Sequence, residues 1–187
     1  MKTSVFVGCS VDGFIARHSD AFDFLSGGDG EHVDNGFEKF LATVDAILMG
    51  RRTYEVVWPF PTWPYGATPV FVLSSHPIAP APTGAVVHAC AGTPTEVFAQ
   101  LQAQGYQHVY VDGGQTIQGF LRDGLIDRIV MTRVPVLIGD GVSLFGEVDG
   151  DIRLQHVSTR TLNGGAVQSE YLVSARATQS GPSIRAP

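Results

Sequence analysis

The sequence predicts an α/β fold: a three-layer sandwich with a mostly parallel central sheet and an antiparallel C-terminal hairpin. Short β-branched and aromatic runs alternate with segments of helical spacing, a pattern typical of a parallel sheet covered by helices. Near the end of the chain, two strand-like runs flank Asn163-Gly164-Gly165, a turn signal that predicts a hairpin. Hydrophobic residues make up 44% of the chain and charged residues 16%, so a sizeable core is expected.

In the first half, the β-branched and aromatic run at residues 4–9 predicts a buried strand. Residues 36–44 carry apolar side chains at i, i+3, i+4 and i+7, which predicts one face of a helix. The apolar run 45–49 predicts a second strand. Residues 53–57 then continue as a brief helix, closed by two prolines that have no N–H to donate. Residues 69–73 predict another buried strand.

In the second half, a short strand at residues 86–88 precedes Thr93-Pro94, an N-cap followed by proline at the first helical position. Gly105 ends the helix that starts there. The remaining predicted elements are a strand at 108–111, a helix between Gly113-Gly114 and Gly124, a strand at 128–134, and the hairpin strands 151–162 and 166–173.

The length of 187 residues predicts one domain, over residues 1–174, followed by a flexible tail at 175–187. Twelve Lys and Arg against 18 Asp and Glu give a net charge of −6 without basic clusters, which argues against a nucleic-acid partner. Two cysteines exclude a disulfide framework, and no Cys/His spacing indicates a metal site. No signal peptide or membrane-spanning run is apparent, so we expect a cytoplasmic protein that binds a small molecule.

Two segments place glycine between a strand and a helix N-terminus. They are residues 46–55 (AILMGRRTYE), which turn at Gly50, and residues 109–117 (VYVDGGQTI), which turn at Gly113-Gly114. Each turn offers free backbone N–H groups and the positive helix end to an anion. In open α/β sheets, ligands bind at the carboxyl ends of parallel strands, where both turns are expected.

Arg51 and Arg52 add two guanidinium groups suited to a terminal phosphate, and Ser74-Ser75 brings hydroxyls to the same edge. Two phosphate-binding turns and a separate Arg/Ser cluster favour a dinucleotide with an extra phosphate, hence NADPH. In the alternative interpretation, each glycine only permits a tight turn and each arginine is solvated. The sequence has neither GxGxxG nor GxxxxGK[ST], which disfavours an ordinary Rossmann domain or P-loop.

Five motifs occur in a characteristic order. They are SVDGFIA at 10–16, ILMGRRTYE at 47–55, VLSS at 72–75, VDGG at 111–114, and PVLIGDG at 135–141 followed by Leu144-Phe145. As an ordered set they resemble dihydrofolate reductase-like proteins, and specifically the RibD C-terminal domain, the reductase domain of bacterial riboflavin biosynthesis. The resemblance covers roughly residues 2–173 and implies a dihydrofolate reductase-like fold and an NADPH-dependent reductase.

The resemblance also implies a set of cofactor-binding residues. The set comprises a phosphate and 2′-phosphate site (Gly50, Arg51, Arg52, Thr53), an adenosine contact (Leu73, Ser74), a pyrophosphate loop (Gly113, Gly114, Gln115, Thr116) and a nicotinamide contact (Ile15, Ala16). It places Asp12 and Gly13 at the mouth between cofactor and substrate.

The sequence does not identify the general acid. Dihydrofolate reductases place an acidic residue on the first long helix, and here residues 23–34 offer several acids without a clear register. Asp34 either caps the helix that begins near Gly36 or delivers a proton. Asp12 either lines the mouth or serves as a turn residue before Gly13. These two aspartates are the weak catalytic candidates.

Other candidate residues carry less information. The six histidines show no metal spacing and are expected to be isolated surface or core residues. The aromatic, proline-interleaved loop at residues 58–65 either stacks on a flat heterocycle, covers the site, or simply packs down.

The resulting hypothesis is a reductase that moves a hydride from NADPH to a C=N or C=O group of a small pterin-like or aminopyrimidine ribosyl phosphate substrate. One alternative is the 5-amino-6-(5-phosphoribosylamino)uracil reductase of riboflavin biosynthesis proper, and another is a non-catalytic nucleotide-binding module. The zinc deaminase signature is absent, so this chain does not carry out the zinc-dependent deamination that precedes this reduction in riboflavin biosynthesis. A homodimer is also expected, because the long apolar run 128–137 would be unsafe at a sheet edge.

Overall fold

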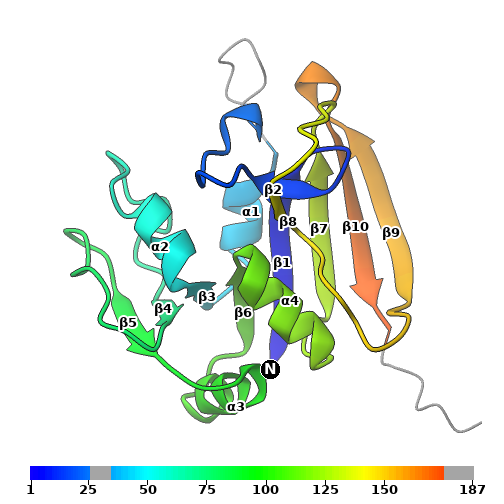
Figure 1. Ribbon diagram of the computed structural model, residues 1–187. Coiled ribbons are helices and arrows are strands. Elements are labelled where there is room, and N and C mark those ends of the chain that lie inside the picture. The colour runs from blue at the N-terminus through cyan, green and yellow to red at the C-terminus, as the bar shows by residue number, and fades with distance from the viewer. Residues whose placement is uncertain (26–34, 175–187) are drawn as a thin grey trace, which may run out of the picture.

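A computed structural model describes residues 1–25 and 35–174 and is built around one eight-stranded sheet (Figure 1). The strand order is β5-β4-β3-β6-β1-β7-β10-β9. The strands are β1 (Lys2–Cys9), β3 (Ala46–Gly50), β4 (Val70–Leu73), β5 (Val87–Cys90), β6 (His108–Asp112), β7 (Arg128–Arg133), β9 (Leu154–Thr161) and β10 (Val167–Val173). The first six in this order run parallel, and β10 is antiparallel to both β7 and β9. The predicted mostly parallel sheet with an antiparallel C-terminal hairpin is confirmed.

Helices cover both faces of this sheet. They are α1 (Phe37–Leu41), α2 (Arg51–Val57), α3 (Pro94–Ala103) and α4 (Gly114–Arg122), with the 3-10 turns η1 (Asp23–Leu25) and η2 (Asn163–Gly165). In β1, Val5 and Val7 pack in the core under α3 and α4, whereas Phe6 packs in the core under α1 and α2. Because successive side chains of a strand point to opposite faces, this alternation produces two cores and the predicted three layers.

The helices differ in detail from the sequence prediction. The helix α1 holds five residues, and α2 begins at Arg51, so both arginines belong to its first turn. The N-cap position of α1 is Gly36, and the Phe37 amide donates to Asn35 Oδ1 at 3.0 Å. Asp34, predicted as an N-cap or proton donor, lies outside the described residues, as does the predicted tail at 175–187.

A second, two-stranded sheet was not predicted. It pairs β2 (Phe14–Ala16) with β8 (Val142–Ser143) in antiparallel fashion, beside the carboxyl end of β1. Strands of three and two residues are too short to show a period of two, so the sequence pattern carries no signal for them. This small sheet pairs the SVDGFIA motif with the two residues that directly follow the PVLIGDG motif.

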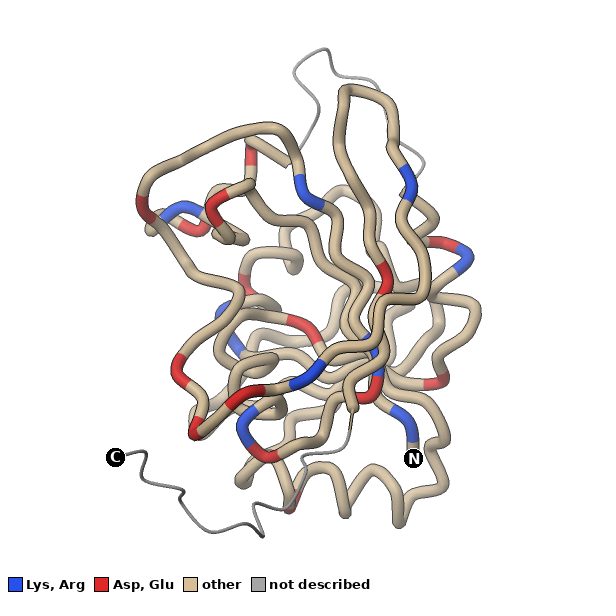
Figure 2. The backbone as a smooth tube through the Cα atoms, turned by 90° about the vertical axis from the view of Figure 1, so that its right-hand side faces the viewer, with Lys and Arg blue, Asp and Glu red and all other residues tan. Residues whose placement is uncertain are grey.

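The run that suggested a homodimer lies inside the sheet. The strand β7 pairs with β1 on one side and β10 on the other, so it needs no second subunit to cover it. That reason for expecting a dimer is therefore wrong, and the dimer itself stays a prediction for sedimentation measurements. Within the described residues, no helix is long and apolar enough to cross a membrane. Figure 2 shows acidic and basic residues interspersed on the face that it presents, rather than gathered by sign.

Candidate active site

One cavity of about 670 Å³ lies at the carboxyl ends of the parallel strands. Eleven of the twelve residues that the resemblance assigns to the cofactor line it: Ile15, Ala16, Gly50, Arg51, Arg52, Thr53, Leu73, Ser74, Gly113, Gly114 and Gln115. The twelfth, Thr116, is buried behind the wall, where its hydroxyl would be 3.1 Å from a Cβ placed on Gly50. Segments that are far apart in the sequence are thus brought into one cleft by the order of the parallel strands.

The two glycine turns pack against each other at the floor of this cavity. Gly113 has φ +88°, and a Cβ there would overlap the Thr53 hydroxyl. A Cβ on Gly114 would lie 3.1 Å from both Ile15 Cδ1 and the Ser143 carbonyl oxygen. Side chains at these positions would fill the space between the turns, so glycine keeps a backbone-lined cradle open. A pyrophosphate-sized group fits such a cradle, because it needs close approach to backbone N–H groups.

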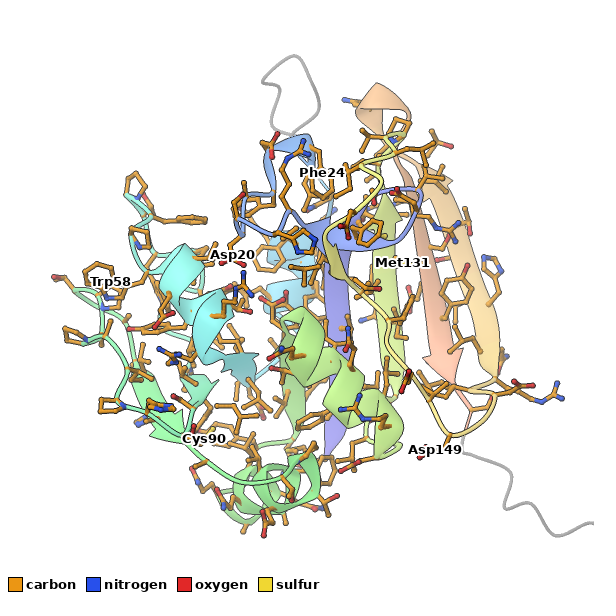
Figure 3. All side chains as sticks on the ribbon, in the orientation of Figure 1. Asp20, Phe24, Trp58, Cys90, Met131 and Asp149 are labelled. Carbon is orange, nitrogen blue, oxygen red and sulfur yellow. The ribbon has the colours of Figure 1, made fainter. Side chains whose placement is uncertain are left out.

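The two arginines are already engaged with acidic side chains. Arg51 Nη1 donates to Glu55 Oε1 at 2.9 Å, one helical turn along α2. Arg52 Nε lies 2.6 Å from Asp20 Oδ1, and its Nη2 donates to the His18 carbonyl at 3.0 Å. Asp20 lies on the loop after β2, beside α2 (Figure 3). Arg52 therefore connects this loop to α2, whereas the partner of Arg51 within the described residues, Glu55, lies on its own helix.

Polar groups after β4 form the end of the cavity assigned to adenosine. The Ser74 hydroxyl accepts from the His76 amide at 3.0 Å and donates to the His76 carbonyl at 2.7 Å. Ser75 Oγ lies 3.0 Å from His76 Nδ1. His76 lines the cavity, although the sequence analysis grouped it with the other histidines. Its position directly after the Ser-Ser pair is the signal that distinguishes it.

The opposite end of the cavity is apolar. Ile15 and Ala16 of β2 lie there with Phe6, Phe22 and Val142. Such side chains would exclude water around a flat ring bound between them. Asp12 does not line the cavity, because its carboxylate accepts hydrogen bonds from the amides of Ile138 (3.2 Å) and Gly139 (2.8 Å).

Asp12 is thereby a structural contact between two loops. A hydrogen bond from Ser10, with help from the two amides, lowers the pKa of Asp12, so this residue stays ionised at neutral pH. A carboxylate held in this way fixes the turn after β1 to the 135–141 loop. The geometry favours the turn interpretation of Asp12 over the catalytic one.

Asp112 is the acidic residue that the sequence reasoning missed. It ends β6, lines the cavity, and accepts the Gly113 amide through Oδ1 at 2.8 Å. The side chains of Tyr65 and Tyr110 also hydrogen-bond its carboxyl group. Burial raises the pKa of Asp112, partly opposed by the Gly113 amide. The available signal was its place at the carboxyl end of a strand, directly before the glycine pair.

The aromatic loop at 58–65 mainly packs down. Trp63 stacks edge-on against Tyr54 and Tyr65, with ring centroids 6.1 and 5.1 Å apart. Phe60 meets Phe22 at 6.1 Å, and Phe22 lines the cavity whereas Phe60 does not. The loop thus supports the cavity wall from behind and delivers one polar group, the Tyr65 hydroxyl, to Asp112.

The described residues include two free cysteines and no cluster of metal-ligating side chains. Burial raises the pKa of Cys9 and of Cys90 to about 11, so both thiols are protonated at neutral pH. Across residues 1–25 and 35–174, no three His, Cys, Asp or Glu side chains gather as they would around a metal ion.

The sequence model described as "RibD C-terminal domain" matches residues 2–168, nearly the whole chain. The chain belongs to the RibD C-terminal domain family. Bacillus subtilis protein YwjB, whose name marks it as uncharacterized, is 31% identical over 173 residues, covering 91% of this chain and 97% of its own. The crystal structure of a putative riboflavin biosynthesis protein from Shewanella sp. PV-4 is 37% identical, with a TM-score of 0.83, and the match covers 93% of this chain and 99% of that one.

Two solved structures with much lower sequence identity share this fold. Dihydrofolate reductase from Enterococcus faecalis, solved with NADP(H), is 18% identical with a TM-score of 0.61 and covers 92% of this chain and 96% of its own. The Thermotoga maritima deaminase/5-amino-6-(5-phosphoribosylamino)uracil reductase is 13% identical with a TM-score of 0.70 and aligns over 56% of its length and 92% of this chain. The dihydrofolate reductase-like fold predicted from the motifs is confirmed.

Proposed function

We propose that this RibD C-terminal domain protein is an NADPH-dependent reductase that transfers a hydride to a C=N or C=O group of a small pterin-like or aminopyrimidine ribosyl phosphate. The observation that supports the proposal most strongly is the single cavity lined by both glycine turns, Arg51, Ser74 and Ile15. A dinucleotide needs backbone donors for its pyrophosphate and an apolar face for its nicotinamide, and the cavity offers both.

Different parts of the cavity would bind different parts of the cofactor. The backbone of Gly113 and Gly114 would hold the pyrophosphate, and Thr53 lies across from them. Arg51 and Ser74 would hold the 2′-phosphate, and Ile15 and Ala16 would orient the nicotinamide ring and exclude water. When bound, NADPH supplies the hydride, so the protein's contribution is binding, orientation and proton management.

A second candidate is the riboflavin-pathway reaction itself, the reduction of 5-amino-6-(5-phosphoribosylamino)uracil. The family match and the likeness to the Shewanella riboflavin biosynthesis protein favour it. Purified protein mixed with NADPH and this aminopyrimidine, or in parallel with dihydrofolate, separates the two candidates by loss of nicotinamide absorbance. Consumption with the aminopyrimidine alone supports the riboflavin role. Binding of NADPH without consumption in either mixture supports a non-catalytic nucleotide-binding module instead.

Replacing Arg51 tests the assignment of the cofactor. Arg51→Ala removes a guanidinium from the cavity wall and leaves the Arg52–Asp20 ion pair in place. A charge-assisted hydrogen bond contributes about 1.5–3 kcal/mol, so NADPH affinity should fall by roughly 10-fold or more. NADH affinity should barely change, because NADH has no 2′-phosphate. Calorimetric titration of both cofactors measures the difference.

The matched control for that variant is Arg153→Ala, which removes an exposed arginine outside this cavity. It alters net charge equally but should leave the affinity for both cofactors unchanged. Equal losses for NADPH and NADH in Arg51→Ala would contradict the 2′-phosphate assignment, and so would equal losses in the two variants.

A further inference from the structure

We propose that Asp20 is a positioning residue of the cofactor site: its carboxylate holds Arg52 away from the pyrophosphate of a bound dinucleotide and so limits the affinity for both NADPH and NADH. The inference rests on the proposed reductase function and concerns a residue that neither the motifs nor the family resemblance indicated. It is carried by the ion pair between Asp20 and Arg52, because both residues line the cavity that contains the two glycine turns.

The Arg52 guanidinium is held by the loop that follows β2. Its Nε lies 2.6 Å from Asp20 Oδ1 and 2.7 Å from Asp20 Oδ2, so both carboxylate oxygens face it. Its Nη2 donates to the His18 carbonyl at 3.0 Å. Figure 3 shows Asp20 beside α2, the helix that carries the arginine. The loop therefore occupies the Nε and Nη2 side of the guanidinium, a side that can form a paired contact with a phosphate.

Arg52 lines the same cavity as the cradle formed by Gly113 and Gly114. It directly precedes Thr53, whose hydroxyl would overlap a Cβ placed on Gly113. Arg51 has its partner along α2, whereas Arg52 has its partners on the loop after β2, the strand expected to contact the nicotinamide. We therefore assign Arg52 to the pyrophosphate, the part of the dinucleotide that NADPH and NADH share.

The ion pair is exposed enough for a phosphate to displace it. The Asp20 side chain is 31% exposed and the Arg52 side chain 63%, so water screens their attraction. A pyrophosphate carries more negative charge than one carboxylate and accepts paired hydrogen bonds from a guanidinium. Binding of a dinucleotide would draw Arg52 to the pyrophosphate, while the Asp20 carboxylate would turn to water. The free energy needed to break the ion pair lowers the affinity for the cofactor.

The backbone at Asp20 fixes where this carboxylate lies. Asp20 has φ +67° and is the one non-glycine residue with a positive φ in the part of the chain that the structure describes. Its amide donates to the Arg17 carbonyl at 2.9 Å, and the Arg17 amide donates to the Ala21 carbonyl at 2.8 Å, which closes a tight turn. Asparagine tolerates this backbone region about as well as aspartate. Asp20→Asn therefore removes the charge and preserves the turn.

The other charged side chains of this segment have partners outside the cavity. Arg17 Nε lies 2.8 Å from Asp23 Oδ1, and His18 Nε2 lies 3.1 Å from Asp140 Oδ2. None of these four residues lines the cavity. Asp23→Asn is therefore a matched control for Asp20→Asn, because it removes the same charge a few residues away and leaves Arg52 paired.

Calorimetric titration of NADPH and of NADH tests the inference without turnover. Asp20→Asn should bind both cofactors more tightly, and by the same factor of roughly 3 to 10. Asp23→Asn should leave both affinities unchanged. A merely structural role of Asp20 predicts the opposite sign, since damage to the turn does not tighten binding. Unchanged or weaker binding in Asp20→Asn overturns the proposal, and so does an equal gain in Asp23→Asn. Asp20→Gly suits the positive φ and should give the same gain, which keeps the test decisive if Asp20→Asn does not fold.

Arg52→Gln separates competition for Arg52 from direct repulsion of the phosphates by Asp20. Alone, this variant should weaken NADPH and NADH equally, unlike Arg51→Ala. Combined with Arg52→Gln, Asp20→Asn should give little further gain, because the group for which the carboxylate competes is gone. A full gain in the double variant would mean that Asp20 repels the phosphates directly, which overturns the proposed role of Arg52.

The rates of binding give a further readout. Asp20 can pair again with Arg52 as the cofactor leaves, so stopped-flow dissociation of NADP⁺ should be slower in Asp20→Asn by about the factor that the affinity for NADP⁺ gains. A gain carried by faster association instead would indicate long-range attraction and overturn the proposal. If the wild type binds neither cofactor, the proposed reductase function fails and this inference with it. If the cofactors bind and Asp20→Asn has no effect, this inference alone fails.

Discussion

At the scale of single residues, the cradle depends on Gly113 for two separate reasons. Its φ of +88° disfavours any side chain, and a Cβ would overlap the Thr53 hydroxyl. Gly113→Ala should destabilise the fold by more than the ~1 kcal/mol that a positive φ alone costs. It should also weaken NADPH binding, because the two turns are forced apart. Thermal unfolding and cofactor titration measure the two effects.

Gly124→Ala separates the two causes. Gly124 has φ +68°, and a Cβ there would meet no atom within 4 Å. This variant should show the cost of a side chain at a positive φ without a clash, and unchanged NADPH affinity. Adding Thr53→Ala to Gly113→Ala should recover part of the lost stability, since it removes the hydroxyl that clashes. If Gly113→Ala and Gly124→Ala lose the same stability and leave NADPH affinity unchanged, the close packing against Thr53 does not explain why glycine occupies position 113.

The same scale shows what the sequence could reveal about the site. Gly50, Arg51 and Gly113 were predicted because two glycine turns between a strand and a helix occur together with an arginine pair. Asp112 was overlooked since an isolated aspartate before glycine is usually a turn residue, and its importance depends on contacts with Tyr65, 47 residues earlier. Nothing local in the sequence reports that contact. Asp12 attracted notice for its motif, although its partners are the amides of a distant loop.

At the scale of elements, the N-terminus of α3 tests how well capping was predicted. Thr93 Oγ1 accepts from the Glu96 amide, and the Glu96 carboxylate accepts from the Thr93 amide at 2.8 Å, which completes a capping box. Thr93→Ala should cost about 1 kcal/mol of stability. Thr83→Ala, at an exposed loop threonine before β5, is the control and should cost little. Chemical denaturation checks both, and equal midpoints would contradict the capping role.

Elements with a long apolar pattern were predicted well, and short ones were not. The strands β1, β3 and β4 lie within one or two residues of their predicted bounds because buried parallel strands are continuous apolar runs. The apolar spacing extended α1 to Val44, yet the helix ends at Leu41 and the chain continues in single turns: the amides of Thr43 and Val44 bond three residues back, to Phe40 and Leu41. A tight turn preserves the apolar spacing, so spacing alone does not locate the helix end.

At the scale of the whole molecule, the site exists because β3 and β6 are neighbours. Leu48 pairs with Val111 and Met49 with Asp112, which sets the two glycine turns side by side. Strand order within a parallel sheet leaves no trace in a single sequence, so residue patterns could place both turns at the carboxyl edge of the sheet but could not show that they are neighbours. The family resemblance implied the dihydrofolate reductase-like fold, whereas the glycine turns and the arginine pair indicated which residues could contact phosphate groups.

Asp112 and Asp12 contribute to the pH dependence of stability with opposite signs. Burial raises the pKa of Asp112, so the folded state binds more protons than the unfolded chain from about pH 4 upward, and stability falls as pH rises through the folded pKa. The hydrogen bond from Ser10 lowers the pKa of Asp12, so its contribution is present above about pH 4 and is lost as pH falls through the folded pKa.

Asn replacements should therefore shift the melting temperature in opposite directions at neutral pH. Asp112→Asn mimics the neutral acid and removes the penalty for a buried carboxylate, so the variant should melt above the wild type at pH 7–8 and near it in acid. Asp12→Asn removes a stabilising carboxylate and should melt below the wild type at pH 7–8, with the gap closing in acid. Calorimetric scans across this range measure both shifts: a loss of stability in Asp112→Asn at neutral pH would mean that the Asp112 carboxylate is stabilised in its ionised form, and would contradict a pKa raised by burial.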